Sequence, residues 1–486
     1  MKNPKYKLAF PGKHVWVFNG HPMTQFNGYK LNTTAIGNGV VSADKSRGYY
    51  GESATLYVSA GPNYTYSGME VDVGTLDNNT YVFGKGDATL SAYFEMDYDP
   101  LNPLGLPDYT IRLKYKDNVT PTFKYGVGVQ VSQSPNIWDL TYNNNNWSTL
   151  LENDNDLLEI MGANSKYVTS ITRITDSCKS LSSVALFDTS NVTSMYMSFG
   201  SDKNLSSIPH FNTKNVINMY GTFIGTPIEE IPLFDTSNVK DMSNLFLNCM
   251  KLRTIPKFNT TNVTSMAATF GCCFNLSSIP LLDTSNVTNM DSMFSQSNIQ
   301  TIPNIDTSKV SSMNGMFSFS NVTGIPLIDT SNCTSMKEMF SNTKIKSIPV
   351  LNTSGVVNID SMFRQCSIVS IPSLNTSNVS SMEDCFRNCS ALSSVNNFDT
   401  TKVKNMSYSF AECSALTSIP TFNLPVIENM NYTFMRCGKV TSGASAVYSN
   451  VSSRANDIQH NYTFFNCGIN TTQGSAELAQ IPSGWK

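Results

Sequence analysis

The chain has 486 residues, which is too long for one ordinary compact domain, so several units or one extended repeat array are expected. Charged residues make up only 14% of the chain and the formal net charge is -3, so no basic surface is available for a phosphate backbone and no nucleic-acid partner is expected. No stretch approaches the roughly 18 apolar residues that span a bilayer, so we expect no membrane insertion.

Residues 1–26 form an N-terminal arm with no clear fold of its own. The arm carries positive charge but lacks the apolar run of a secretory signal, so we expect no export leader in it. Its aromatic run from His14 to Phe18 has the composition of a docking segment. We therefore treat the arm as a candidate attachment segment.

Two β regions are predicted between the arm and the middle of the chain. Residues 27–96 alternate apolar and polar positions between dense turn signals, which predicts a small antiparallel β domain. Residues 97–165 are predicted to form a second β segment and the N-terminal cap of a solenoid. Within that segment, residues 147–162 have helical spacing and a glycine stop, so we expect a capping helix there.

The remainder of the chain, residues 166–470, repeats itself every 23 or 24 residues. A Met, or Ile359 in one case, follows seven residues after the start of each unit, and a Phe follows four residues later, from Phe199 to Phe434. This period is typical of leucine-rich repeats. The units open on Asp188, Asn212, Asp235, Asn259, Asp283, Asp306, Asp329, Asn352, Asn375, Asp399 and Asn423.

About eleven such repeats predict a mainly β leucine-rich-repeat solenoid with short helical turns. Burial of the apolar side chains of one unit contributes roughly 10 kcal/mol. Ordering the backbone costs about 1 to 2 kcal/mol for each residue of the unit, so a unit cannot fold alone and must stack on its neighbours. We expect one strand around Leu-x-x-Ile, a second around Val-x-x-Met, and a helical turn in Met-x-x-x-Phe-x-x-Cys. Residues 471–486, with Trp485, should close the far end as a C-terminal cap.

Three ladders in the repeat suggest sites but are better explained by stacking. A row of aspartates attracts cations, yet Asn alternates with Asp, and both can cap the Thr-Ser-Asn turn. Cysteine shares its position with Ser and Thr, which indicates a small buried side chain, with disulfides or a metal cluster as the alternatives. The Met ladder indicates core packing. We therefore predict no metal and no cofactor.

The unit Asp-Thr-Ser-Asn-Val-x-x-Met-x-x-Met-Phe-x-x-Cys-x-x-Leu-x-x-Ile-Pro resembles the BspA-like leucine-rich repeats of bacterial surface proteins. The stretch from Gly39 to Phe94 resembles the internalin-type B-repeat, a small β module found beside such repeats. Both resemblances imply adhesion and neither implies chemistry. Family members at cell surfaces normally carry a leader, and similar arrays in tailed phages of gut bacteria do not, so the resemblance implies a virion protein.

Catalysis has little support, because the four histidines are scattered and no nucleotide-binding fingerprint is present. We therefore predict a non-enzymatic protein. Its candidate ligand contacts are tyrosines that follow the repeat Met by one or two residues, where exposed rings could stack on sugars; partial burial at coil edges is the alternative. These residues are Tyr196, Tyr220, Tyr408 and Tyr432.

The function predicted first is a bacteriophage virion structural or adhesion protein, a tail or head fibre or a decoration. Residues 1–165 would attach to other virion or surface proteins, and the solenoid would bind a host-surface glycan or protein. The alternative is a bacterial cell-surface adhesin, and a third hypothesis is a decoration without a receptor. The corresponding locations are the virion, assembled in the host cytoplasm, or the bacterial surface. A homo-oligomer is compatible with each.

Overall fold

The structure is a computed structural model that describes residues 17–18, 21–22, 29–36, 39–48, 50–60, 64–77, 79–84, 86–96, 102 and 104–486. The chain divides into two compact units, Met1–Pro103 and Leu104–Lys486. Each unit has its own apolar core and is described by itself.

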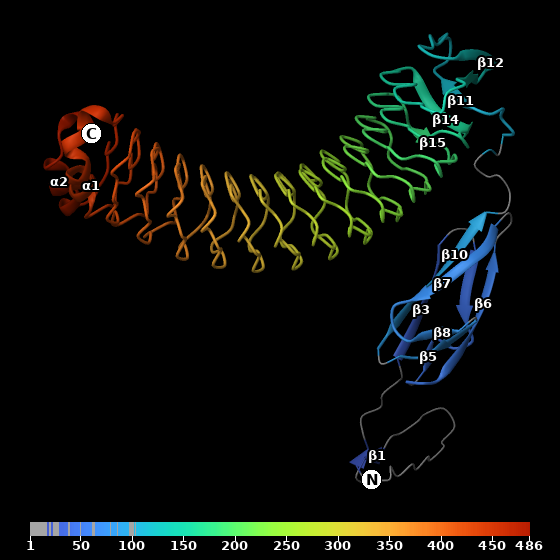
Figure 1. Cartoon of the computed structure of the whole chain (residues 1–486), viewed down its shortest axis with the longest axis horizontal. Helices are drawn as coiled ribbons and strands as arrows, with labels where there is room; N and C mark the ends of the chain where they lie inside the picture. Colours follow the sequence, from blue (N-terminus) through green and yellow to red (C-terminus); the bar gives the residue numbers. More distant parts are fainter. Residues whose placement is uncertain are drawn as a thin grey trace. The chain divides into compact units, whose positions relative to one another are not determined.

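The first unit contains a two-stranded hairpin and two four-stranded sheets (Figure 1). The sheets have the orders β5-β3-β10-β7 and β4-β6-β9-β8. The strands are β1 (Val17–Phe18), β2 (His21–Pro22), β3 (Tyr29–Ile36), β4 (Gly39–Ala43), β5 (Arg47–Gly48), β6 (Ser53–Ala60), β7 (Tyr64–Val71), β8 (Thr75–Asp77), β9 (Thr80–Val82) and β10 (Ala88–Met96).

The core of this unit comes from the alternation that the sequence shows. Leu56, Tyr81 and Leu90 are buried, while the residues beside them in their strands are exposed or half-buried; Phe83, directly after β9, is buried as well. One pairing departs from the prediction of an antiparallel domain, because β10 runs parallel to β3. β3 and β10 are far apart in the chain, and the strands between them include all four of the second sheet as well as β5 and β7 of the first. After these strands, β10 returns beside β3 in the same direction.

The second unit begins with a five-stranded sheet of order β12-β13-β11-β14-β15. Its last two strands are parallel, so the sheet leads directly into the coils of the solenoid. The strands are β11 (Thr110–Tyr115), β12 (Val127–Gln133), β13 (Asn136–Thr141), β14 (Leu157–Asn164) and β15 (Ser183–Val184).

The helix predicted over residues 147–162 is wrong. Turns occupy the first half of this stretch and β14 the second. The pairing of β14 with β11 skips one residue at each of two irregularities, so buried Leu157 and Ile160 are three residues apart on a strand. Two β-bulges thus reproduce the three-residue spacing that we interpreted as helical.

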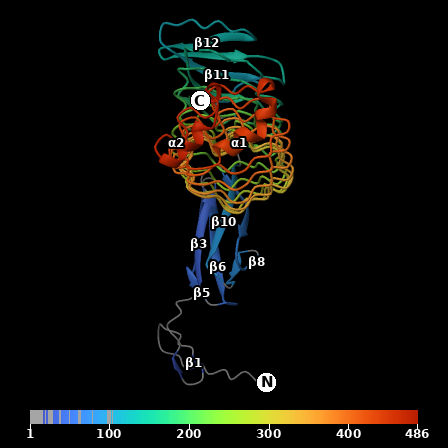
Figure 2. The same ribbon diagram turned by 90° about the vertical axis from the view of Figure 1, so that its left-hand side faces the viewer.

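The coils stack in one continuous array (Figures 1 and 2). Parallel single-residue bridges link each coil to the next and form one continuous ladder. The ladder begins at Asn146 and ends at Gln459, and it has fourteen positions where about eleven repeats were predicted. Two extra coils precede Asp188, where Trp147 and Ile171 take the place of the repeat Met. A third follows the unit of Asn423 and is the degenerate last repeat within the predicted span 166–470. Those coils are harder to recognise because they lack the Asp-Thr-Ser-Asn turn.

The segment from Met to Cys is a series of tight turns and not the predicted helical turn. The amide N–H groups of Met290, Ser292 and Phe294 donate to carbonyl groups of the next coil, at 3.1, 2.7 and 2.9 Å. The N–H groups between them close turns within the coil, as Met293 does to the Met290 carbonyl at 3.2 Å. Ser292 has φ 54°, which suits the third residue of a type II turn.

The two strands predicted in each coil are mostly reduced to isolated bridges and single hydrogen bonds. At the Leu-x-x-Ile position only β15 is a strand. In a later coil, one hydrogen bond remains at this position, from Arg253 N–H to the Glu229 carbonyl at 3.0 Å. Between Met and Cys, alternate N–H groups of a coil bond to the next coil and the others close turns, so the bonds between coils do not extend into a regular strand. The fold class nevertheless stands, since the unit is a mainly β repeat solenoid.

The core of the second unit is one apolar cluster that runs the length of the array. The repeat phenylalanines are buried and stack in register, with ring centroids 5.8 Å apart for Phe270 and Phe294 and 5.4 Å apart for Phe363 and Phe386. The repeat Met and Val side chains are buried with them. This matches the core predicted from the ladders.

Helices close the far end of the array. Helix α1 (Ala444–Val451) and the 3-10 helix η1 (Ser452–Asp457) are inserted in the last coil, and α2 (Thr472–Ala479) and the 3-10 helix η2 (Ser483–Trp485) follow it. The buried ring of Trp485 stacks on His460 with centroids 4.1 Å apart. Among the described residues, no helix has the length and apolar content needed to cross a membrane.

Candidate binding surface

The Asp/Asn ladder caps the turn that opens each coil. Asp283 Oδ1 accepts hydrogen bonds from Ser285 N–H at 3.0 Å and from Ser285 Oγ at 2.7 Å, and these bonds lower the pKa of Asp283. Asn375 Oδ1 accepts the same pair from Ser377 at 3.1 and 2.7 Å. The amide of Asn thus makes the same two hydrogen bonds as the carboxylate of Asp. No group of three or more His, Cys, Asp or Glu side chains in the described part of the chain is placed to hold a metal.

The cysteine ladder is also structural. All eleven cysteines are free thiols, and all except Cys272 are buried. Cys413 Sγ donates to the Phe386 carbonyl of the preceding coil at 3.0 Å, and burial raises the pKa of this thiol well above its usual value. In a coil with threonine here, Thr226 Oγ1 donates to the Phe223 carbonyl at 2.7 Å. The position therefore selects a small side chain that can donate a hydrogen bond.

A buried carboxyl group that the sequence analysis did not single out lies near the start of the array. Asp202 occupies the cysteine position of its coil and is completely buried. Its Oδ2 accepts from Thr175 Oγ1 at 2.7 Å, its Oδ1 accepts from Cys178 N–H at 2.8 Å, and burial raises its pKa to about 8. Thr175 stands where later coils have Phe, which leaves room for the carboxyl. The group is enclosed, so it cannot meet a ligand.

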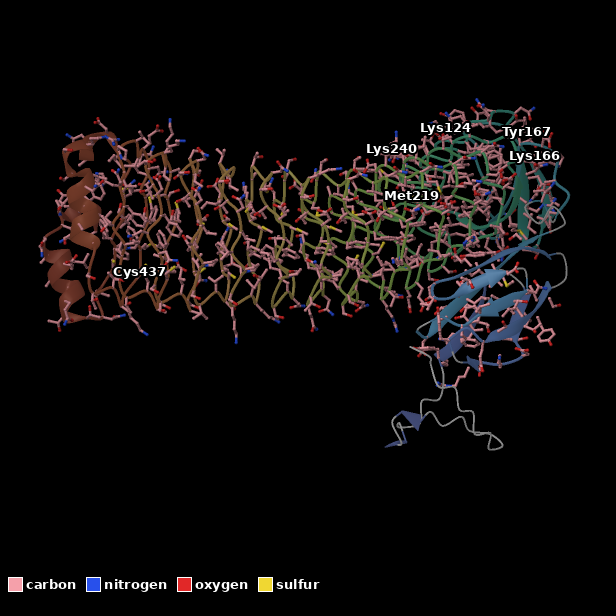
Figure 3. All side chains as sticks on the ribbon, turned by 60° about the horizontal axis from the view of Figure 1, so that its bottom comes forward. Lys124, Lys166, Tyr167, Met219, Lys240 and Cys437 are labelled. Carbon is pink, nitrogen blue, oxygen red and sulfur yellow. The ribbon has the colours of Figure 1, made fainter. Side chains whose placement is uncertain are left out.

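One lateral face of the array is formed largely by short polar side chains, with a few longer ones such as Ile217 and Lys240. In most of the turns, an Asn ties its coil to the preceding one, as Asn262 Nδ2 does to the Ser237 carbonyl at 2.7 Å. Thr264 and Thr288, two residues after such asparagines, are exposed. A shallow hollow of about 500 Å³ lies on this face, and Lys240 in its lining is labelled in Figure 3. The hollow is lined by Asn191, Thr193, Asn215, Ile217, Asn238 and Lys240.

The four tyrosines predicted as ligand contacts lie in two separate stacks. Tyr196 and Tyr220 stack with centroids 4.9 Å apart near the start of the array, and both are half-buried. Tyr408 and Tyr432 stack 4.5 Å apart near its end and are also half-buried. The coil spacing places like positions face to face, so ring faces inside a stack cover each other and the ring edges remain at the surface.

The second stack is longer than the sequence indicated. The ring of Tyr462 continues it at 5.5 Å from Tyr432 and is 49% exposed. The guanidinium of Arg387 covers the opposite end, 4.6 Å above the ring of Tyr408. Tyr462 was missed because His460 replaces the repeat Met in its coil. We call Arg387, Tyr408, Tyr432 and Tyr462 the tyrosine stack.

The repeats match the family model described as "Mycoplasma protein of unknown function, DUF285". The matches cover residues 152–228, 169–278, 226–323, 272–368 and 357–470. Together they span 152–470, which is well over half of the chain. The chain belongs to this family. None of the curated proteins matches it.

Two solved structures are similar to part of this DUF285 chain. A leucine-rich repeat protein from Eubacterium ventriosum is 14% identical, covers 63% of this chain and 84% of its own, and has a TM-score of 0.34. A leucine rich cell surface protein from Faecalibacterium prausnitzii is 15% identical, covers 70% and 98%, and has a TM-score of 0.33. Likenesses this distant do not indicate the function of this chain. None of the comparisons supports the predicted virion.

Proposed function

We propose that this chain is a non-enzymatic adhesion protein of a bacterial cell surface that binds an extended, hydroxyl-rich glycan along the side of its solenoid. The location is the alternative from the sequence analysis, and cell surface is also the printed description of the Faecalibacterium prausnitzii protein. A host-surface protein is the other ligand class that the sequence analysis allowed.

The single observation that carries the proposal is the tyrosine stack. Inside the coils, the Asp, Asn, Thr and Cys side chains are engaged in hydrogen bonds that hold the array together. In the tyrosine stack, by contrast, Tyr408 and Tyr432 are stacked and half-buried and Tyr462 is 49% exposed, so parts of these rings remain at the surface. The side chains available to a ligand are therefore found at positions that vary from coil to coil, such as those of the tyrosine stack.

The stack suits a long ligand because its rings are fixed before binding. Their backbone belongs to the hydrogen-bonded ladder, and Arg387 is held over Tyr408 and bonded to Asp384 at 3.2 Å. A rigid aromatic surface loses little conformational entropy when a ligand binds. Tyrosine edges offer both apolar contact and hydroxyl groups, which match the C–H and O–H groups of a sugar chain.

The proposal is tested with the full chain on an array of immobilised glycans. The variant Tyr408→Ala/Tyr432→Ala should weaken binding by about tenfold or more, since large aromatic anchors dominate such interfaces. The matched control is Tyr57→Ala, which removes a tyrosine 59% exposed in the first unit and should bind normally. Binding that is identical in both variants, or no glycan bound by the unaltered chain, would refute the proposal.

The location is tested separately by fractionating cells that make the protein. Antibody against the full chain should label intact bacteria and the envelope fraction. Recovery of the chain in purified phage particles would instead restore the virion prediction.

A further inference from the structure

Strand β12 is the outermost strand of the sheet that begins the second unit. It pairs with β13 on one side, and among the described residues no strand pairs with its other edge. Its position in the order β12-β13-β11-β14-β15 places this free edge at the end of the hydrogen-bonded stack. Figure 1 shows β12 at the extremity of the second unit opposite to helices α1 and α2. The outward backbone groups of β12 are thus available to another strand.

The free edge carries an apolar row. Val127, Val129 and Val131 are 69%, 60% and 49% exposed, although valine is ordinarily a core residue. Val129 lies opposite Asp139 of β13, which forms an ion pair with Arg112 at 2.7 Å, so this row lies on the polar face of the sheet. Burial in the core of the unit therefore does not explain the valines.

The usual protection of an edge strand is largely missing here. Natural edge strands are shielded by lysine, proline, bulges or short length. β12 has seven residues and contains neither charge nor proline. Its register shifts once, between Gln130 and Ser132, which leaves Val127–Gln130 regular. The ring of Phe123 packs directly against Gly128 and holds the strand in place: a Cβ at this position would lie 2.1 Å from the ring.

We propose that β12 pairs antiparallel with β12 of a second copy of this chain across a twofold axis near Val129. With the axis at Val129, Val129 faces its own copy and Val127 faces Val131 of the other chain, so a charge at the axis would meet a like charge. β12 consists only of Val, Gly, Gln and Ser, so it is compatible with itself in this register. The valines of the two copies then form one continuous β-branched row.

The pairing should stop at two copies. Each chain has one such free edge at this end of the array, and the other end is closed by α1, α2 and the buried Trp485. An interface that uses the same edge on both partners is closed by its own symmetry. A discrete dimer is therefore expected and a filament is not. The inference does not depend on the proposed glycan binding.

The test measures the mass of the full chain in solution by light scattering and sedimentation over a range of concentrations. The unaltered chain should be a dimer that dissociates on dilution. Val129→Glu and Val129→Lys should each be monomeric, because like charges meet at the axis. A mixture of the two variants should recover dimers, because opposite charges then meet.

Leu327→Glu is the matched control, since Leu327 is 70% exposed in the array and away from β12; it should remain dimeric. Val129→Cys should in addition form a disulfide-linked dimer on mild oxidation that the unaltered chain does not form. A disulfide-linked dimer is a gain of signal, so a variant that merely fails to fold cannot imitate this result. A monomeric unaltered chain, a dimer that survives both charged substitutions, or a mixture that stays monomeric would overturn the proposal.

Discussion

At the scale of single residues, the sequence predicts which positions are buried but not which partner each side chain finds. The alternation of Cys, Ser and Thr correctly indicates a small buried side chain. It does not show that Cys413 donates to the preceding coil while Thr226 donates within its own. Asp202 escaped notice for the same reason, because its burial depends on the missing phenylalanine at Thr175, one coil away.

The buried carboxyl of Asp202 makes the stability of the array depend on pH. Burial raises its pKa from 3.8 to about 8, so between these values it is ionised in the unfolded chain and protonated in the folded one. Folding then takes up a proton, and stability should fall as pH rises through this window, by up to about 1.4 kcal/mol per pH unit. Below the window both states are protonated and the effect vanishes.

Asp202→Asn should remove this part of the pH dependence and stabilise the chain at pH values above the window, as followed by thermal unfolding. Asp306→Asn is the control, because hydrogen bonds from Ser308 lower the pKa of Asp306 and its titration lies below the window. If the two variants have the same pH profile, the buried carboxyl does not act as described.

At the scale of the element, the sequence predicts the period of the coil better than its conformation. The spacing from Met to Phe and Cys imitates a helix, yet the backbone alternates between turns within the coil and bonds to the next one. Left-handed residues make this alternation possible. Some are glycine, such as Gly315 with φ 58°, and many are not, such as Ala268 with φ 51°. Propensity alone does not predict so many positive φ values outside glycine.

Gly315→Ala should destabilise the array by about 1 kcal/mol in denaturant unfolding, because the new Cβ is strained at a positive φ. The nearest atom to that Cβ would be Ser292 Oγ at 3.3 Å, a tight contact that this short side chain can relieve by a small shift, so the backbone strain is the main cost. Gly324→Ala is the matched control: nothing lies within 4 Å of its Cβ and its φ is not positive, so no loss is expected. Equal losses in both variants would contradict a role of the left-handed turn.

At the scale of the whole molecule, the solenoid could be predicted and its ends could not. Repetition reveals the coils because each one needs the same contacts as its neighbours. The terminal coils meet different partners, so Trp147, Ile171 and His460 replace the repeat methionine; this conceals the first two coils and makes the last one degenerate. In the tyrosine stack, Tyr408 and Tyr432 were predicted as contacts, and Tyr462 of the last coil was not. The free edge of β12 depends on sheet order, which local sequence does not encode.

The C-terminal cap is where the stability of the array can be tested as a whole. Trp485 is buried against the last coil, stacked on His460 and in contact with Tyr448, with ring centroids 4.1 and 5.5 Å apart. Its carbonyl also accepts Phe464 N–H at 2.8 Å, which ties the cap to the last ring of the phenylalanine ladder. Trp485→Ala should therefore destabilise the cap by about 3 to 5 kcal/mol.

In a stacked array each coil is stabilised chiefly by its immediate neighbours, so this loss should remain local at first. Hydrogen exchange of Trp485→Ala should accelerate in the coils around Phe434 and Phe464 and stay unchanged around Phe199. Leu327→Ala, at an exposed position, should leave exchange unaltered throughout. Uniform acceleration along the whole array would show instead that the coils unfold as a single cooperative unit, and the cap would then protect every coil equally.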